Sequence, residues 1–274
     1  YTPLIIGSVK EFLYFLGIII NGPRLFFEET FRNYSKTHCF QSTAICGRKI
    51  VSWSKEISCD DLKLKSRRNQ QTHSEILLST VSSCLMNFFS ESLRVPSYVD
   101  VNFRSVAYGY LFGSNYIKNG VVGIRLPVER PSMKQLVQIR EQIKSTQDTQ
   151  VVTYLMSLIQ IKFDFLTTVL PSLWLKLIIN FLSRKFSITV TEVLGFNQPE
   201  PADYFTTYDA EILDVLFFRT PQANTSMAVT IQRFKNNIRM NLMCDMNLSG
   251  RHHLISSHFS EAFNQLPVVK HTIK

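Results

Sequence analysis

The chain has 274 residues, of which 45% are hydrophobic and 19% are charged, a balance that excludes an intrinsically disordered protein. The formal net charge of +9 suits an anionic partner, which leaves nucleic acid, anionic lipid and phosphorylated cofactors as classes to separate. Five cysteines without CxxC spacing argue against a zinc module and against a disulfide framework.

The first predicted element is an apolar helix over residues 10–32. Its central run, FLYFLGIII, has nine residues without a charge, whereas a membrane crossing needs ~20 apolar residues. We therefore expect this helix to be buried or to lie at a membrane interface, with Leu13, Leu16 and Ile20 on one face. Further along, the short basic cluster KLKSRR at 63–68 is interpreted as a solvated loop in preference to a binding patch.

The rest of the chain alternates between the two periodicities of regular structure. The predicted helices are 74–92, 132–146, 150–168, 172–184 and 251–266. The predicted strands are 98–104, 121–127, 187–194 and 211–218, followed by a hairpin of 226–232 with 237–243. This pattern predicts an α/β fold (α+β layered) with a mixed sheet and flanking helices.

Four stretches, in their order and spacing, carry a resemblance to a known family. THSEILLSTVSSCL at 72–85 resembles that family's NDVLLA helix, and VDVNFRS at 99–105 resembles its VPVSVR strand. GSNYIKNGVVGIRLPV at 113–128 resembles its GN…LP segment, and ITVTEVLGF at 188–196 resembles its SNVPGP strand and turn. Over about residues 50–270 the chain thus resembles the C-terminal half of the wax ester synthase/acyl-CoA:diacylglycerol acyltransferase (WS/DGAT) family.

The resemblance implies a lobe like that of chloramphenicol acetyltransferase and a tunnel between two such lobes. Residues 1–95 would then hold the end of the N-terminal lobe with the crossover, and residues 96–274 the C-terminal domain. The implied reaction transfers an acyl group from acyl-CoA to diacylglycerol or to a fatty alcohol. Acyl-CoA would be a co-substrate, with no bound cofactor and no metal.

The family's general base belongs to an HHxxxDG motif in its N-terminal lobe, and the sequence suggests no catalytic residue in this chain. By resemblance, the candidates for contact with acyl-CoA are Asn115, Thr191 and Gly195. The chain also departs from the pattern, since Ser74-Glu75 replaces the Asn-Asp pair and TEVLGF replaces SNVPGP. In that second motif Glu192 stands in place of the Asn.

The stretch RHHLISSH at 251–258 invites comparison with HHxxxDG, but the spacing fails. Ser257 takes the Asp place and His258 takes the Gly place. A metal site would need histidines three or four residues apart on one helix face, and His253 with His258 is an i, i+5 pair. A solvated or partly packed helix start is the favoured interpretation.

Two readings of the chain stay open. The start at Tyr1 favours a portion of an active acyltransferase that lacks its N-terminal lobe, whereas the altered motifs favour an inactive paralogue that binds lipid or acyl-CoA. In either case we expect a protein at the cytosolic face of the endoplasmic reticulum or plasma membrane. The dispersed charges and the lack of a recognised motif argue against nucleic-acid binding.

Overall fold

The computed structural model describes most of the chain between Ile45 and Val268, with gaps. The described residues are 13, 16–17, 20–24, 27, 39–42, 45–90, 95–105, 120–148, 173, 186–193, 206–207, 210–211, 213–221, 225–248 and 251–268. The helix predicted over 150–168 lies outside them, as does all but one residue of the helix predicted over 172–184. Those two predictions therefore stay untested.

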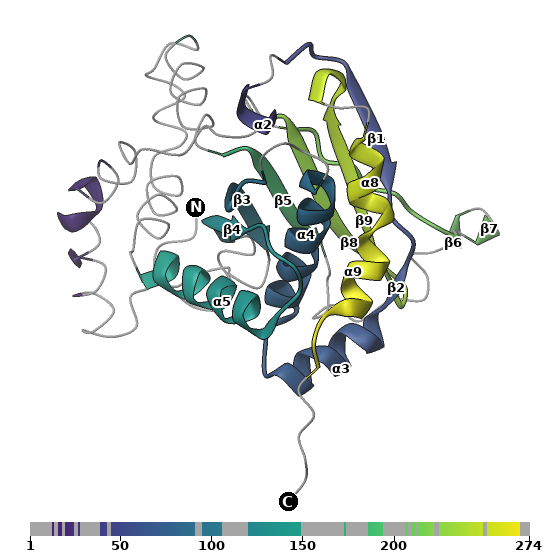
Figure 1. The fold of residues 1–274 in the computed structure, drawn as a ribbon, viewed down its shortest axis with the longest axis horizontal. Helices are drawn as coiled ribbons and strands as arrows, with labels where there is room; N and C mark the ends of the chain where they lie inside the picture. Colours follow the sequence, from purple (N-terminus) through teal and green to yellow (C-terminus); the bar gives the residue numbers. More distant parts are fainter. Residues whose placement is uncertain are drawn as a thin grey trace, which may run out of the picture.

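One mixed sheet organises the described residues (Figure 1). Its strands are β1 (Lys49–Trp53), β2 (Ile57–Ser58), β3 (Tyr98–Ser105), β4 (Gly120–Pro127), β5 (Ile188–Val193), β8 (Met227–Phe234) and β9 (Asn237–Asp245). Their order is β1-β9-β8-β5-β3-β4, with β2 also paired to β9. The central pairs β3–β5 and β5–β8 are parallel and the others are antiparallel. A separate pair, β6 (Thr206–Thr207) with β7 (Ala210–Glu211), lies apart from this sheet.

Helices cover one face of the sheet, with α4, α8 and α9 side by side across it (Figure 1). The helices are α2 (Cys39–Ser42), α3 (Cys59–Asn69), α4 (His73–Phe89), α5 (Met133–Asp148), α8 (His252–Ser257) and α9 (Phe259–Gln265), with a 3-10 turn at Met246–Leu248. The core lies between the helices and the sheet, where Val101, Val190 and Val229 are all fully buried. The layered α/β class predicted from the sequence is confirmed.

The central helix α4 begins directly after Thr72, which caps it. The Thr72 hydroxyl accepts a hydrogen bond from the Glu75 N–H at 3.2 Å, and the Glu75 carboxylate accepts one from the Thr72 N–H at 3.1 Å. This reciprocal capping box satisfies two backbone donors that a helix start leaves open. Almost every later residue of α4 is buried, because the helix crosses the middle of the layer.

The basic cluster KLKSRR forms part of α3 rather than a loop, so that prediction was wrong. Ser58 caps the helix by accepting from the Asp60 N–H at 3.1 Å, and Arg67 and Arg68 lie in the last turn, where the helix dipole favours positive charge. Lys65 reaches across to α9 and donates to the Phe263 carbonyl at 2.5 Å. The cluster therefore packs in part against the fold.

The C-terminal helix predicted over 251–266 is divided into α8 and α9. The division falls at His258, whose Nδ1 lies 2.7 Å from the Leu254 carbonyl oxygen. Apolar side chains on both pieces still reach the core, with Ile255, Phe259 and Phe263 almost fully buried. The predicted face was correct, and the single continuous helix was wrong.

In the predicted helix 10–32, every described residue is helical. The side chains of Leu13, Leu16 and Ile20 are exposed, and so is that of Phe27. The buried alternative for this face therefore does not hold at those positions, and the interfacial alternative stays a prediction.

The end of β9 anchors the segment that leads into β1. The buried Asp245 carboxylate accepts from the N–H groups of Cys46 and Gly47 at 3.0 and 2.9 Å and from the Lys49 ammonium at 3.1 Å. Gly47 has a φ of 83°, which only glycine adopts easily. One carboxylate thus joins residues 199 positions apart in the chain, and elements on both sides of the predicted boundary at 95/96 share one sheet.

Candidate functional site

The face of the sheet opposite the helices is polar at its centre. Side chains alternate along each strand, so apolar residues that face the helices are separated by residues that face the other way. The polar residues at the centre of this face are Asn102 and Arg104 of β3, Thr189 and Thr191 of β5, Thr230 and Gln232 of β8, and Asn241 of β9. Most of them are buried, with Thr189, Thr230 and Asn241 each 1% exposed. Buried polar groups need hydrogen-bond partners.

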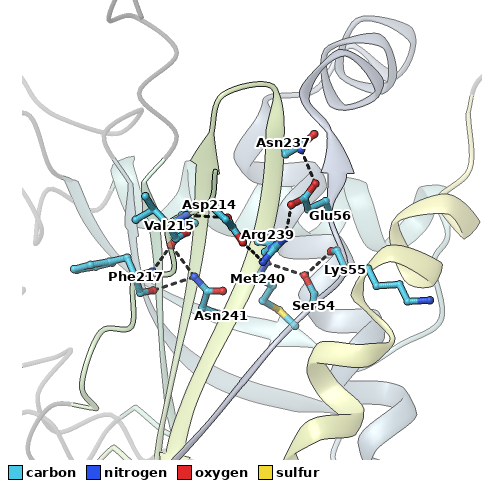
Figure 2. A network of polar contacts seen from close by, with 11 residues as sticks. Ser54, Lys55, Glu56, Asp214, Val215, Phe217, Asn237, Arg239, Met240 and Asn241 are labelled. Atoms are coloured by element: carbon cyan, nitrogen blue, oxygen red, sulfur yellow. Dashed lines mark hydrogen bonds and ion pairs between the residues drawn. The ribbon is translucent and has the colours of Figure 1, made fainter. Parts of the chain in front are cut away.

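Residues 213–221, here called the crossing segment, supply many of those partners (Figure 2). The Gln232 side chain donates to the Val215 carbonyl and accepts from the Phe217 N–H at 2.5 Å. The Asn241 amide donates to the Phe217 carbonyl at 3.0 Å and to the Gln232 amide oxygen at 2.7 Å. Two side-chain amides thus bind the backbone of the crossing segment.

The strand predicted at 211–218 is wrong for this reason. Of the described residues in that range, Glu211 alone belongs to a short strand, and residues 213–221 have no regular structure. Leu213, Val215 and Phe217 alternate as in a strand. The backbone groups of Val215 and Phe217, however, bind amide side chains and not a neighbouring strand. All three side chains are exposed.

An ion-pair network holds the start of the crossing segment. Arg239 of β9 lies between Asp214 and Glu56, as Figure 2 shows, and its guanidinium is 2.5 Å from the Asp214 carboxylate and in contact with that of Glu56. Glu56 also accepts from the Asn237 amide at 2.5 Å. A planar guanidinium can serve two carboxylates at once, which suits it to this position.

Arg219, near the end of the crossing segment, lies at the centre of the polar face. Its backbone N–H donates to the Thr230 hydroxyl, and its guanidinium Nη1 donates to the Thr191 hydroxyl, both at 3.3 Å. Arg104 of β3 lies opposite Thr191 in the strand register. We call Arg104, Thr191 and Arg219 the arginine cluster.

The arginine cluster concentrates positive charge. Burial lowers the pKa of Arg104, and the charge of Arg219 lowers it further; burial also lowers the pKa of Arg219. Among the described residues, no carboxylate forms an ion pair with Arg219. Asp100, on the same face, is paired with Arg125 at 3.3 Å. Such an arrangement favours a negatively charged ligand.

Two further polar atoms lie beside the cluster. Asn102 Oδ1 and Thr189 Oγ1 are buried and have no hydrogen-bond partner within the part of the chain that the structure describes. Both residues precede a member of the cluster by two positions on the same strand face, Asn102 before Arg104 and Thr189 before Thr191. The polar face therefore holds unused hydrogen-bonding capacity next to its positive charge.

Of the three residues suggested by family resemblance, only Thr191 lies in the described structure, and it is at the centre of the arginine cluster. Asn115 and Gly195 lie outside the described residues. Sequence reasoning did not single out Arg104 or Arg219. The alternation of Asp100, Asn102 and Arg104 along β3 was a usable signal for a polar face, whereas Arg219 is placed only by the crossing segment.

The histidines of RHHLISSH lie on the helix side of the sheet, away from the arginine cluster. His258 lines a pocket of about 480 Å³ with side chains from α4, α9 and the turn before α5, among them Met86, Arg130 and Glu261. No group of three or more side chains suited to a metal ion occurs among the described residues. The HHxxxDG spacing is absent from all 274 residues.

The sequence matches the model of a known protein family. A family model described as the WS/DGAT C-terminal domain matches residues 117–267. The chain belongs to this family. Strands β5, β8 and β9 and helices α8 and α9, together with Thr191 and Arg219, fall within the match, whereas Arg104 precedes it.

Solved structures show the same fold for this WS/DGAT chain. The wax ester synthase/diacylglycerol acyltransferase from Marinobacter aquaeolei VT8 has a TM-score of 0.56 at 10% identity, and the alignment covers 91% of this chain and 56% of that one. The epimerization domain from the third module of tyrocidine synthetase B has a TM-score of 0.54 at 9% identity, covering 97% and 59%. At these identities the similarity concerns the fold, and it confirms the predicted acyltransferase-like lobe.

The match to these structures covers only part of their length. The WS/DGAT chain spans a little over half the length of these two structures, and no curated protein sequence matches it. Within the described residues, no helix has both the length and the apolar character needed to cross a membrane.

Proposed function

We propose that this WS/DGAT chain is part of an acyltransferase that moves an acyl group from acyl-CoA to the hydroxyl of a lipid alcohol, either diacylglycerol or a fatty alcohol. The observation that carries the proposal is the family match over residues 117–267. In the reaction, the acceptor oxygen attacks the thioester carbonyl, the carbon–sulfur bond breaks, and the hydroxyl proton passes through a general base to the departing thiolate. The products are an ester and free CoA.

Within this proposal the chain contributes binding surface and not the general base. It contains no HHxxxDG, so the base would come from an N-terminal lobe outside these 274 residues. Its own contribution is the polar sheet face, where the arginine cluster offers positive charge to an anionic donor. Enzymes often bind non-reacting parts of a substrate tightly in order to position the reacting atoms.

A membrane surface is the proposed source of the acceptor. The net charge of +9 favours anionic lipid, and the described positions of the N-terminal helix expose Leu13, Leu16, Ile20 and Phe27. A helix that lies in the interface would hold the enzyme where diacylglycerol or fatty alcohol is dissolved. The proposed location is the cytosolic face of the endoplasmic reticulum or plasma membrane.

The test is an acyl-transfer assay on the 274-residue chain and on the longest transcript product that contains it. Labelled palmitoyl-CoA is supplied with diacylglycerol or with hexadecanol, and the products are triacylglycerol or wax ester. Activity of the longer product, lost when the second His of its HHxxxDG is changed to Ala, would support the proposal. Absence of both products from every form would refute it.

A second candidate function is binding without turnover, and a specific observation favours it. Both Ser74 and Glu192 depart from the family pattern, and they contact each other in the structure. An inactive paralogue would bind palmitoyl-CoA but release no CoA even when joined to an intact N-terminal lobe. Measuring binding and CoA release on the same sample separates the two functions.

A further inference from the structure

We infer that Arg104, Arg219 and Thr191 form a binding site for a phosphate group, and, resting on the proposed function, that this phosphate belongs to the CoA portion of the acyl donor. The site is on the polar sheet face and is held in place by the crossing segment. Its chemistry is that of a phosphate monoester or diphosphate bound between two guanidinium groups.

The positive charge of the arginine cluster favours an anionic ligand. Two partly buried guanidinium groups next to each other repel, and burial removes the water that would screen them. A dianionic phosphate bound to both groups would replace that repulsion with two attractions. Arginine suits this role because its planar fork donates two parallel hydrogen bonds to phosphate oxygens.

Two threonine hydroxyls beside the guanidinium groups can donate hydrogen bonds to a ligand. Thr191 Oγ1 already accepts from Arg219, so its own O–H proton is available for donation. Thr189 Oγ1 is almost fully buried without a hydrogen-bond partner among the described residues, and it faces the same side of β5. Phosphate presents several acceptor oxygens, so two guanidinium groups and two hydroxyls are a matched set of donors.

Two described carboxylates that lie near the cluster, and that could compete with a phosphate, have other partners. Glu192 is adjacent to Thr191 in sequence, but it points to the opposite face, where it accepts from Ser74. Asp100 is on the same face as the cluster and is engaged by Arg125. Among the described residues, neither carboxylate forms an ion pair with Arg219, so the positive charge of that guanidinium would attract an anion and repel a metal cation.

Hydrogen bonds from β8 and β9 hold the backbone that carries Arg219. Arg219 is part of an irregular segment, but Gln232 and Asn241 bind the backbone two and four residues before it. The Arg219 N–H is itself bound by Thr230. A binding arginine is useful only when its position is set in advance, and these side chains on β8 and β9 set it.

The experiment measures CoA binding to the whole protein by isothermal titration calorimetry. We expect Arg219→Gln and Arg104→Gln each to weaken CoA binding about tenfold or more, because a charge-assisted bidentate contact is lost. Arg68→Gln, which removes one exposed charge from α3, is the matched control and should leave CoA binding within about twofold. Arg219→Lys keeps the charge without the fork and should give an intermediate loss.

Folding is checked separately for each variant by near-ultraviolet circular dichroism. Should Arg219→Gln fail to fold, Thr191→Val removes one donor at constant side-chain size, and a several-fold loss of CoA affinity is then the expected result. Dephospho-CoA, which lacks only the 3′-phosphate, shows which phosphate is bound. If dephospho-CoA binds the native protein and the arginine variants with the same weak affinity, the 3′-phosphate occupies the cluster. If the affinity for dephospho-CoA also falls in Arg219→Gln, the diphosphate occupies the cluster.

Other phosphate sources are tested with inorganic phosphate and with phosphatidylcholine vesicles that contain or lack phosphatidic acid. If only the phosphatidic acid vesicles depend on Arg219, the donor assignment is overturned in favour of a lipid headgroup. If none of these ligands responds to Arg104→Gln or Arg219→Gln, the phosphate site is refuted, even where acyl transfer itself is observed. Absence of acyl transfer from every form, together with an arginine-dependent CoA site, would refute the proposed function and retain this inference.

Discussion

The Ser74 hydroxyl donates a hydrogen bond of 2.5 Å to the Glu192 carboxylate, across 118 residues of sequence. Ser74 is in the first turn of α4 and Glu192 is near the end of β5, and both are buried. By the resemblance given in the sequence analysis, these are the two positions at which an Asn of the family's motifs is replaced. The two departures therefore form one contact, which joins the central helix to the central strand.

Removal of this contact should destabilise the fold. Ser74→Ala leaves a buried carboxylate without one of its donors, and we expect the free energy of unfolding to fall by about 1–3 kcal/mol. Glu192→Gln keeps an acceptor for the serine and should cost less. Urea unfolding of both single variants and the double variant measures the coupling. Additive effects of the two changes would show that the contact contributes nothing.

Asp245 should make stability depend on pH in the acid range. Burial acts to raise the pKa of its carboxyl, but hydrogen bonds from Cys46, Lys49 and Asn247 outweigh it, so the net pKa lies well below its usual value. A depressed pKa in the folded state means that this stabilisation is complete above the unfolded-state pKa of about 4 and is lost as the pH falls below it.

The matching variant is Asp245→Asn, which removes the charge. At pH 7 it should lower the free energy of unfolding by about 2 kcal/mol or more, because hydrogen bonds to a charged group are lost. The difference between this variant and the native protein should shrink as the pH is lowered from 5 toward 2, as followed by thermal unfolding. A difference that stays constant over that range would contradict this account.

Gln232 should position Arg219 through the crossing segment. Gln232→Leu removes the two hydrogen bonds to Val215 and Phe217 and should lower the free energy of unfolding by about 1–3 kcal/mol. Limited proteolysis should then cut within residues 213–221, and CoA affinity should fall as it does in Arg219→Gln. Gln265→Leu, at an exposed position of α9, is the control. Unchanged proteolysis and unchanged CoA affinity would show that the crossing segment is held by other contacts.

The exposed face of the N-terminal helix should govern binding to membranes. Leu13→Ser combined with Ile20→Ser should weaken sedimentation with anionic vesicles about tenfold, because buried apolar area contributes in proportion to its size. Leu64→Ser, at an exposed position on α3, is the control for loss of a leucine. Equal sedimentation of all forms would exclude the helix as the membrane contact.

The sequence by itself determined the elements whose residues repeat with a regular period. The alternation of Val99, Val101 and Phe103 predicted β3, and the spacing of Leu136, Ile139 and Ile143 predicted α5, because each buried face requires apolar residues at its own period. The order of those elements was also enough to indicate the family. Thr191, suggested by that resemblance, lies in the arginine cluster.

The tertiary structure alone decided the rest. Residues 213–221 have strand-like alternation, yet side-chain amides from β8 and β9 form hydrogen bonds with backbone groups of this segment. The local sequence pattern does not indicate these bonds. The break at His258 and the pairing of Ser74 with Glu192 are likewise set by packing. The meeting of Arg104 with Arg219 depends on strand register and on a distant loop. Periodicity is local and can be read along the chain, whereas hydrogen bonds between distant residues exist only once the chain has folded.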